Sequence, residues 1–320
     1  MTMTPFASPV VSIIVATRNR PDLLSQCLEG IAAQSYEAVE VIVVDDGSNA
    51  ATRHRYTSLC PTLAGRLKWL LPDHQDTPGT GPSAARNRGL QVATGTFVAL
   101  CDDDDHWIRA DHVATGVRAL ELSAADFYFT NLVASRDGEV VDYCWFPQLE
   151  LLKTGRTLLQ RPAVFAVDLD TVLHVVGGTV IHPDCWIVRR SLLNEVGGFW
   201  ERLWYEEDYD LMMRLLASAR SILFRSDPCA DYRLPASDSV SKQSSRMEIV
   251  LQQIMAAQHI RLLATKAVVR RCARAREAWC LRRLAREFRS KGRRRDAWFF
   301  AWQGLCTYPT LGALRQCLWG

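Results

Sequence analysis

Four consecutive aspartates, Asp102 to Asp105, follow directly on the apolar run from Phe97 to Cys101. The apolar run predicts a buried strand, so the sequence gathers carboxylates at the point where that strand ends. Ionised carboxylates this close raise one another's pKa and destabilise the fold unless a cation neutralises them. Oxygen ligands suit Mg²⁺ and Mn²⁺, which keep coordination positions open for substrate phosphates. The alternative interpretation is a solvated acidic turn that caps the next helix.

The elements that must position these acids alternate between strand and helix over the first 105 residues. Val11 to Ala16 is a β-branched run typical of a strand buried on both faces, and Pro21 is expected to begin a helix. The alternation predicts an α/β fold with a doubly wound, mostly parallel sheet and helices on both of its faces. Further strands are expected at 39–44, 67–71 and 96–101, and a helix capped by Ser83 is expected to run to about Val92.

A second acidic pair, Asp45 and Asp46, follows the strand expected at 39–44. Ligands of doubly wound sheets bind outside the carboxyl ends of the strands. We therefore expect this pair and the 102–105 cluster to lie at the same edge of the sheet.

Four ordered segments carry a resemblance to family 2 glycosyltransferases, over roughly residues 9 to 241. The resemblance implies a GT-A fold: a nucleotide-sugar-binding half at 1–110, then an acceptor-binding half with a catalytic base at 111–245. A helical, basic C-terminal extension at 246–320 completes the expected organisation. The segments are Val11-Ser12-Ile13-Ile14-Val15 with Thr17-Arg18-Asn19-Arg20, Val43-Val44-Asp45-Asp46-Gly47-Ser48, Gly81-Pro82-Ser83-Ala84-Ala85-Arg86-Asn87-Arg88-Gly89, and Asp102-Asp103-Asp104-Asp105-His106-Trp107.

The resemblance also implies donor contacts. Asp46 would accept a hydrogen bond from the nucleotide base, which Ala16, Thr17 and Arg18 would border. Arg86 and Asn87 begin a helix whose backbone donors, with the guanidinium, suit a pyrophosphate. The alternatives are that Asp46 is a turn residue before Gly47 and that Arg86 forms a surface ion pair.

The family's Asp-x-Asp metal motif falls on Asp102, Asp103 and Asp104 when Trp107 is aligned with the usual aromatic residue. Asp104 is the first choice as metal ligand, Asp102 contacts the ribose or the metal, and Asp105 is able to substitute for either. His106 is expected to be a loop residue and not a ligand. Many relatives carry a histidine shortly after a Tyr-Arg pair, whereas here Tyr232-Arg233-Leu234 is followed by Pro235. Asp238 or Ser239 is the candidate to replace it.

The segment Trp204 to Leu211 is a second acidic constellation, and the apolar spacing after it predicts a helix. A helix N-terminus stabilises carboxylates, so Asp208 is expected to be ionised at neutral pH. The resemblance assigns Glu207-Asp208 to the family's Glu-Asp motif, in which the aspartate is the catalytic base. The alternative is a capping role. Trp204 and Tyr205 either stack on the acceptor or belong to the core.

These assignments predict an inverting glycosyltransferase that needs Mn²⁺ or Mg²⁺ and a nucleotide-diphosphate sugar. Its acceptor would be a glycan, a lipid-linked glycan or a peptide, in polysaccharide or glycoconjugate biosynthesis. One rival is a nucleotidyltransferase acting on a sugar phosphate, but that class normally carries a Gly-rich loop where this chain has Thr17 to Arg20. The other rival is an inactive carbohydrate-binding GT-A domain, which would lose the acids that this chain keeps.

Composition places the protein among globular chains, with 48% hydrophobic and 23% charged residues. The ten cysteines are scattered without a CxxC pair, which favours reduced thiols in a cytosolic protein. The apolar stretch from Val10 to Ala16 lacks a basic leader, so we expect a strand and not a signal peptide. No apolar run is as long as a bilayer-spanning helix requires.

Charge is unevenly distributed: residues 261–320 hold 15 Lys and Arg against 3 Asp and Glu, although the whole chain is only +3. We expect this region to be helical, with Val268, Cys272, Ala275, Trp279, Leu284 and Phe288 on one face and with a helix end at Gly292. Such basic helices can lie on the inner face of the cytoplasmic membrane, bind a partner, or pack against the acidic body. Nucleic-acid binding is not expected, because no known nucleic-acid-binding fold accompanies the basic residues.

Overall fold

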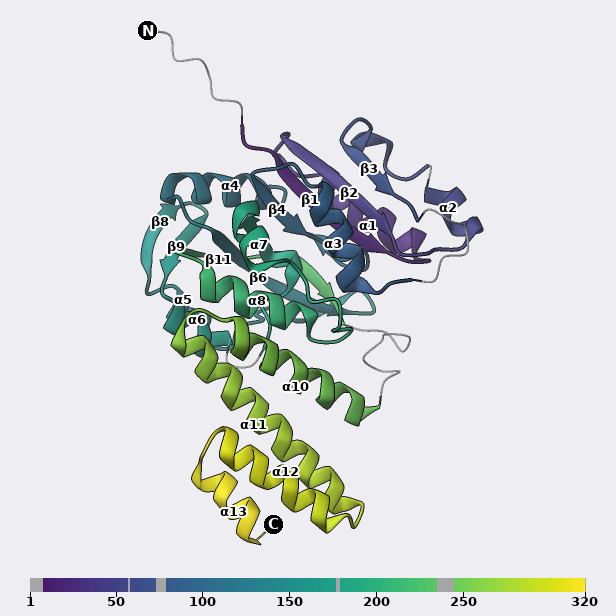
Figure 1. Ribbon diagram of the computed structural model, residues 1–320. Coiled ribbons are helices and arrows are strands. Elements are labelled where there is room, and N and C mark those ends of the chain that lie inside the picture. The colour runs from purple at the N-terminus through teal and green to yellow at the C-terminus, as the bar shows by residue number, and fades with distance from the viewer. Residues whose placement is uncertain (1–7, 57, 73–78, 177–178, 235–244, 320) are drawn as a thin grey trace. The chain divides into compact units, whose positions relative to one another are not determined.

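The computed structural model describes residues 8–56, 58–72, 79–176, 179–234 and 245–319. They belong to two compact units (Figure 1). The first unit comprises 1–177, 181–199 and 219–234, and the second comprises 178–180, 200–218 and 235–320.

The first unit is built on one sheet of 11 strands, in the order β3-β2-β1-β4-β10-β6-β11-β9-β8, with β5 paired to β11 and β7 to β6. Strands β1 to β4 run parallel to one another, and β10 runs antiparallel to both β4 and β6. The sheet is thus continuous across the boundary predicted at residue 110. The strands are β1 Val11–Thr17, β2 Val39–Asp45, β3 Leu67–Leu70, β4 Phe97–Leu100, β5 His106–Trp107, β6 Phe127–Arg136, β7 Glu139–Asp142, β8 Arg156–Gln160, β9 Ala163–Val167, β10 Trp186–Arg189 and β11 Ile222–Arg233.

Helices of the first unit cover this sheet, and Leu24, Cys27, Leu28 and Ile31 form the buried face of α1, as their spacing predicts. Ser83 does not cap α3, contrary to the prediction: Gly81 holds the cap position with φ of 92° and Pro82 is the first helical residue. The helices are α1 Pro21–Ala32, α2 Ala50–Tyr56, η1 Pro61–Leu63, α3 Pro82–Val92, α4 His112–Ser123, α5 Leu149–Leu152, α6 Leu169–Val176, η2 Pro183–Cys185 and α7 Arg190–Val196.

Apolar runs at 127–133 and 140–145, separated by Arg136-Asp137-Gly138, predict a pair of antiparallel strands. Strands β6 and β7 form this antiparallel pair, although β7 ends at Asp142 and not at Trp145. Residues 146–176, which show no clear period in the sequence, hold α5, β8, β9 and α6.

The second unit is helical, as expected for residues 246–319, and it also contains the helix predicted after Trp204. The helices are α8 Glu207–Ser218, α10 Arg246–Leu263, α11 Ala267–Ser290, α12 Arg294–Thr307 and α13 Leu311–Trp319. A capping box between Ser245 and Glu248 begins α10, and Gly292, with φ of 73°, follows the end of α11. None of the helices in the described part of the chain combines the length and apolar character that crossing a membrane requires.

The predicted apolar face of α11 is wrong in its first half. Val269, Ala273 and Cys280 are buried, whereas Trp279 is 44% exposed. Only Leu284 and Phe288 belong to both the predicted and the observed face. The reason is that α11 packs against both α10 and α12. A helix with two neighbours buries a wider part of its surface than the single apolar stripe that was predicted.

Gly89 lets α3 lie directly on the sheet. A Cβ at this position would come within 2.5 Å of Ile14 Cγ2 and 3.3 Å of Val44 Cγ2. Both neighbours are β-branched side chains in central strands, with little freedom to move aside. The closeness of α3 to β1 therefore depends on this glycine.

We predict that Gly89→Ala destabilises the protein by about 1–3 kcal/mol, because the added methyl overpacks the α3–β1 contact. Urea denaturation followed by circular dichroism measures the change. Gly312→Ala in α13 is the matched control, since a Cβ there meets nothing within 4 Å. Equal stability of the Gly89→Ala protein and the wild type would show that α3 can move away from β1 without cost.

Candidate functional site

The carboxyl ends of β1, β2 and β4 lie at one edge of the sheet, as expected. Thr17 pairs with Asp45 in the register of β1 and β2, and Ile14 pairs with Leu100 at the end of β4. The Thr17 hydroxyl donates to Asp103 Oδ2 at 2.7 Å. The segments that follow these three strands are therefore neighbours in space.

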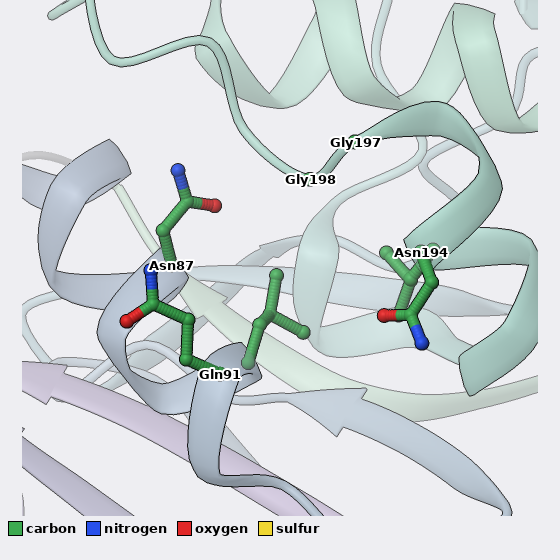
Figure 2. A pocket seen from close by; sticks show the side chains of 7 residues that line it. Asn87, Gln91, Asn194, Gly197 and Gly198 are labelled. Carbon is green, nitrogen blue, oxygen red and sulfur yellow. The ribbon is translucent and has the colours of Figure 1, made fainter.

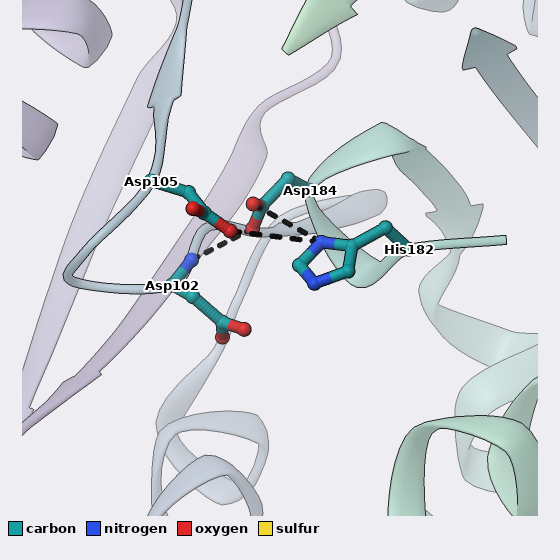
Figure 3. Close-up of side chains that lie close together, drawn as sticks. All are labelled: Asp102, Asp105, His182 and Asp184. Carbon is teal, nitrogen blue, oxygen red and sulfur yellow. Dashed lines mark hydrogen bonds and ion pairs between the residues drawn. The ribbon is translucent and has the colours of Figure 1, made fainter. Parts of the chain in front are cut away.

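A group of four side chains at this edge has the geometry to hold a metal ion: Asp102, Asp105, His182 and Asp184 (Figure 3). One ligand atom from each lies within 4.8 Å of the others. Asp102 and Asp105 follow β4, while His182 and Asp184 precede β10. Because β10 runs antiparallel to β4, its beginning lies at the edge where β4 ends.

The chemistry of this group fits a divalent cation. Asp105 Oδ2 and Asp184 Oδ2 are buried, and no described residue donates a hydrogen bond to either atom. Burial, followed by the charge of Asp184, raises the pKa of Asp105 well above its usual value. His182 Nδ1 lies 3.2 Å from Asp184 Oδ2 and 3.8 Å from Asp105 Oδ2. Carboxylate oxygens suit Mg²⁺ and Mn²⁺, and the imidazole is the one donor outside that preference.

Asp103 and Asp104 point elsewhere. Arg20 Nη1 lies 3.3 Å from Asp103 Oδ1 and 2.9 Å from Asp104 Oδ2, and the Asp104 side chain is 40% exposed. Burial, with the charge of Asp104, raises the pKa of Asp103 to about 7. Asp104 is thus outside the group of four, and its assignment as the first metal ligand stays a prediction. His106 is also outside it and lies in β5, not in a loop as expected.

Arg86 and Asp102, both predicted to contact the donor, are joined by an ion pair of 2.6 Å. The guanidinium also lies over the Phe199 ring, 5.3 Å from its centroid. Burial raises the pKa of Asp102, but the charges of Arg86, His182 and Arg20 and the hydrogen bond from Arg86 together outweigh burial, so the pKa is below its usual value. Helix α3 therefore places the buried guanidinium of Arg86 beside the acidic group. An anionic ligand at this end of the helix would be bound favourably by that charge.

Asp46 organises the loop that enters α3. Its Oδ1 accepts hydrogen bonds from the Thr80 backbone N–H at 2.9 Å and hydroxyl at 2.7 Å, and its Oδ2 accepts from Gly81 N–H at 2.9 Å. Arg18 is exposed and close to Gly79, because a Cβ at Gly79 would lie 2.7 Å from Arg18 Nη1. These contacts give Asp46 a structural role, and the base contacts of Asp46, Ala16, Thr17 and Arg18 stay predictions.

Asn87 is bound to the backbone of Phe199. Its Nδ2 donates to Phe199 O at 2.9 Å, and its Oδ1 accepts from Phe199 N–H at 2.9 Å. Asn87 lines a pocket of about 260 Å³. Figure 2 shows it there together with Gln91 and Asn194. A Cβ on Gly198 would lie 2.7 Å from Asn87 Oδ1, so the glycine is required for this clamp. The pyrophosphate contact of Asn87 stays a prediction.

Glu207 and Asp208 are the first residues of α8 in the second unit, where the positive end of the helix dipole favours carboxylates. The Asp208 Oδ1 atom accepts a hydrogen bond from the Tyr209 N–H at 2.6 Å. Trp204 and Tyr205 are half-buried, and their ring centroids lie 6.2 Å apart with the ring planes tilted by 52°. The role of Asp208 as base stays a prediction, as do the acceptor contacts of Glu207, Trp204 and Tyr205.

Sequence reasoning missed His182 and Asp184. Their only signal is a histidine and an acid directly before the apolar strand Trp186 to Val188. Only the antiparallel direction of β10 relative to β4 shows that these two residues lie beside Asp102 and Asp105. Asp238 and Ser239, the candidates for a third ligand, lie outside the described residues.

Comparison with solved structures defines the class of fold. TarS 1–349 of S. aureus, solved in complex with UDP-GlcNAc, matches with a TM-score of 0.64 at 21% identity, over 96% of this chain and 78% of that one. The mannosyltransferase PcManGT of Pyrobaculum calidifontis, in complex with GDP-Man and Mn²⁺, matches with a TM-score of 0.52 at 19% identity, over 97% and 79%. The fold is therefore the α/β GT-A fold, as predicted.

Sequence comparison identifies the family. Residues 12–197 match the family described as Glycosyl transferase family 2, so this chain belongs to that family. The glycosyltransferase YwdF of Bacillus subtilis is 28% identical over 235 residues, 73% of this chain and 77% of that protein. Glycosyltransferase GlyA of Streptococcus pneumoniae is 32% identical over 133 residues, 42% of this chain but only 18% of GlyA. The matched family region contains the group of four and ends before Asp208.

We predict that Asp184→Asn weakens Mn²⁺ binding by about tenfold or more, because it removes a charged ligand and leaves the shape of the site unchanged. Titration calorimetry on the full chain measures the affinity. Asp104→Asn is the matched comparison, because it tests the ligand that the sequence favours. If Asp104→Asn lost affinity and Asp184→Asn kept it, the metal would be held by the sequence motif and not by the group of four.

Proposed function

We propose that this protein transfers a sugar from a nucleotide-diphosphate donor to an acceptor hydroxyl, with inversion at the anomeric carbon and with Mn²⁺ or Mg²⁺ as cofactor. The observation that carries the proposal is the acidic group of four at the carboxyl edge of the sheet, next to the buried Arg86. Support comes from two proteins of the same fold, one solved with UDP-GlcNAc and one with GDP-Man and Mn²⁺.

Asp102, Asp105 and Asp184, with His182, are the residues that would hold the cation. When bound, the cation supplies positive charge that stabilises the departing nucleoside diphosphate. Arg86 and the backbone N–H groups at the start of α3 would bind the same diphosphate. Because Arg86 is paired with Asp102 in the protein alone, donor binding would have to share or replace that ion pair.

Asp208 would act as the base. It would take the proton of the acceptor hydroxyl while that oxygen forms its bond to the anomeric carbon and the bond from that carbon to the diphosphate oxygen breaks. Attack from the face opposite the leaving group inverts the configuration in one displacement. The negative charge passes to the nucleoside diphosphate.

The rival functions differ in their products. A nucleotidyltransferase acting on a sugar phosphate would release pyrophosphate from a nucleoside triphosphate, whereas sugar transfer releases a nucleoside diphosphate. An inactive carbohydrate-binding domain would release neither. The segment from Thr17 to Arg20 favours sugar transfer, since Thr17 and Arg20 bind Asp103 and no Gly-rich phosphate loop stands there.

We predict that the wild type, supplied with Mn²⁺ and a panel of nucleotide sugars, releases nucleoside diphosphate from at least one donor. Asp208→Asn should keep the donor dissociation constant, because the predicted donor residues are elsewhere in the sequence. Its turnover should fall by about 10²–10⁴-fold, the usual contribution of a general base.

The control is Asp170→Asn, which changes an acid at the start of α6 that the mechanism does not use. Pyrophosphate release from a triphosphate would favour the nucleotidyltransferase. Unchanged turnover by Asp208→Asn would remove Asp208 from the mechanism.

The proposal extends to the location of the acceptor. Trp298, Phe299 and Trp302 on α12 are each about half-exposed, and the two tryptophan rings stack at 5.9 Å. Arg294 and Arg295 at the start of α12 are exposed. Aromatic rings beside arginines suit the headgroup region of an anionic membrane. With free cysteines throughout, this supports a cytoplasmic protein that contacts the inner face of the membrane and acts on a glycan, lipid-linked or peptide acceptor.

We predict that the full chain co-sediments with vesicles containing phosphatidylglycerol and not with purely phosphatidylcholine vesicles. Arg294→Gln with Arg295→Gln should weaken this binding by roughly thirtyfold, since each basic residue near the surface contributes about 1 kcal/mol. The exposed pair Arg118→Gln with Arg136→Gln, in the sheet-containing unit, is the matched control. Equal binding by both double variants would overturn the membrane proposal.

A further inference from the structure

Glu206, two residues before the proposed base, has a backbone conformation that side chains rarely adopt. Its φ is 69°, in the left-handed region. Its carbonyl accepts the N–H of Asp210 at 2.9 Å, so Glu206 is the residue at which the chain turns into α8. A non-glycine residue stays in this region only when its surroundings hold it there. The direction of the first turn of α8, which carries Asp208, depends on how Glu206 is held.

The carboxylate of Glu206 is held by the C-terminal helices. Arg276 Nη2, from α11, donates to Glu206 Oε1 at 2.7 Å and to Oε2 at 2.6 Å. Gln253 Nε2, from α10, donates to Oε1 at 2.9 Å. The side chains of Glu206 and Arg276 are 9% and 13% exposed, so this is a largely buried, charge-assisted contact.

Arg276 also contacts Tyr209, the residue that directly follows Asp208. Its guanidinium lies 4.0 Å from the centroid of the Tyr209 ring, in cation–π geometry. Burial lowers the pKa of Arg276, but the charge of Glu206, its hydrogen bond and the neighbouring Tyr209 together outweigh burial and raise the pKa. One arginine thus touches the residue two before Asp208 and the residue directly after it.

Helix α10 binds the same segment at further points, and α8 packs against it (Figure 1). Gln252 Oε1 accepts the N–H of Trp204 at 3.2 Å, and Gln253 Oε1 accepts from Arg283 at 2.8 Å. His259 Nδ1 lies 2.7 Å from Asp210 Oδ1, and its ring stacks on Trp200 at 4.1 Å. The segment from 200 to 210 is therefore tied to α10 and α11 on both sides of Asp208.

We infer that α10 and α11 belong to the active site, with Arg276 and Gln253 as positioning residues that fix the direction of the proposed base through Glu206 and Tyr209. This inference rests on the proposed function of Asp208. It assigns a role to part of the basic C-terminal region that lies beyond the matched family residues 12–197. A buried ion pair adds little net stability, because desolvation offsets the attraction, so its defining effect here is geometric.

The test compares Arg276→Gln with Arg271→Gln, which changes an exposed arginine of the same helix. With the donor identified by nucleoside diphosphate release, Arg276→Gln should lower kcat by on the order of a hundredfold, as misplacement of a catalytic group by about 1 Å can do. The donor dissociation constant, measured by calorimetry, should stay within about twofold, because such a loss concerns catalysis and not uniform binding. Arg271→Gln should match the wild type. A folded Arg276→Gln protein with wild-type kcat would overturn the inference.

A double variant separates positioning from stability. Glu206→Gln with Arg276→Met replaces the ion pair by neutral side chains of similar size, a change that is often neutral for stability. It should keep the melting temperature near that of the wild type and still lose kcat. If Arg276→Gln fails to fold, this double variant decides the question, and wild-type kcat in it would contradict the inference.

Hydrogen exchange gives a readout that does not depend on the proposed reaction. In Arg276→Gln, backbone amides in a peptide covering 203–212 should exchange faster than in the wild type, while those of 11–17 in β1 should not change. If the wild type transferred no sugar, the proposed function would fail and this result would still be readable. Unchanged exchange at 203–212 would show that Arg276 does not hold the segment.

Discussion

The mutual repulsion of carboxylates buried at the end of β4 is the constraint on which the proposed chemistry depends. Asp102, Asp105 and Asp184 converge with His182, and among the described residues Arg86 forms an ion pair with Asp102. Burial, followed by the charge of Asp184, raises the pKa of Asp105 well above its usual value. A divalent cation at this position would offset the repulsion between the carboxylates. Burying carboxylates that repel one another lowers the free energy of unfolding, a cost that is typical of functional sites.

The same segment separates its acids into two sets. Asp103 and Asp104 face Arg20 and Thr17, whereas Asp102 and Asp105 face the beginning of β10. Asp103 and Asp104 share the guanidinium of Arg20, whereas Asp102 and Asp105 belong to the group of four that has the geometry to hold a cation. Four identical residues in a row thus have different electrostatic surroundings, because a tight turn points successive side chains in different directions.

Much of the fold followed from local pattern. The strands β1, β2 and β4 and the helix α1 were predictable because their apolar residues are periodic and their ends carry turn residues. The first helical residue of α3 was harder, since Gly81 and Pro82 both precede Ser83 and proline is favoured at the first position of a helix. The face of α11 was misjudged around Trp279, because a helix between two neighbours is buried over a wide arc that a single stripe does not describe.

The sequence by itself determined that acids gather at the ends of β2 and β4, that a parallel sheet presents those ends at one edge, and that the C-terminal region is helical and basic. Only the tertiary structure decided which acids meet. Asp184 joins Asp102 from 82 residues away, because β10 returns antiparallel to β4 and so begins where β4 ends. Likewise Arg276 meets Glu206 from 70 residues away, because α11 packs within the unit that contains α8. The local spacing of apolar residues predicts whether a segment is a helix or a strand. The direction in which that element runs, and the element it packs against, depend on how the whole chain buries its apolar surface.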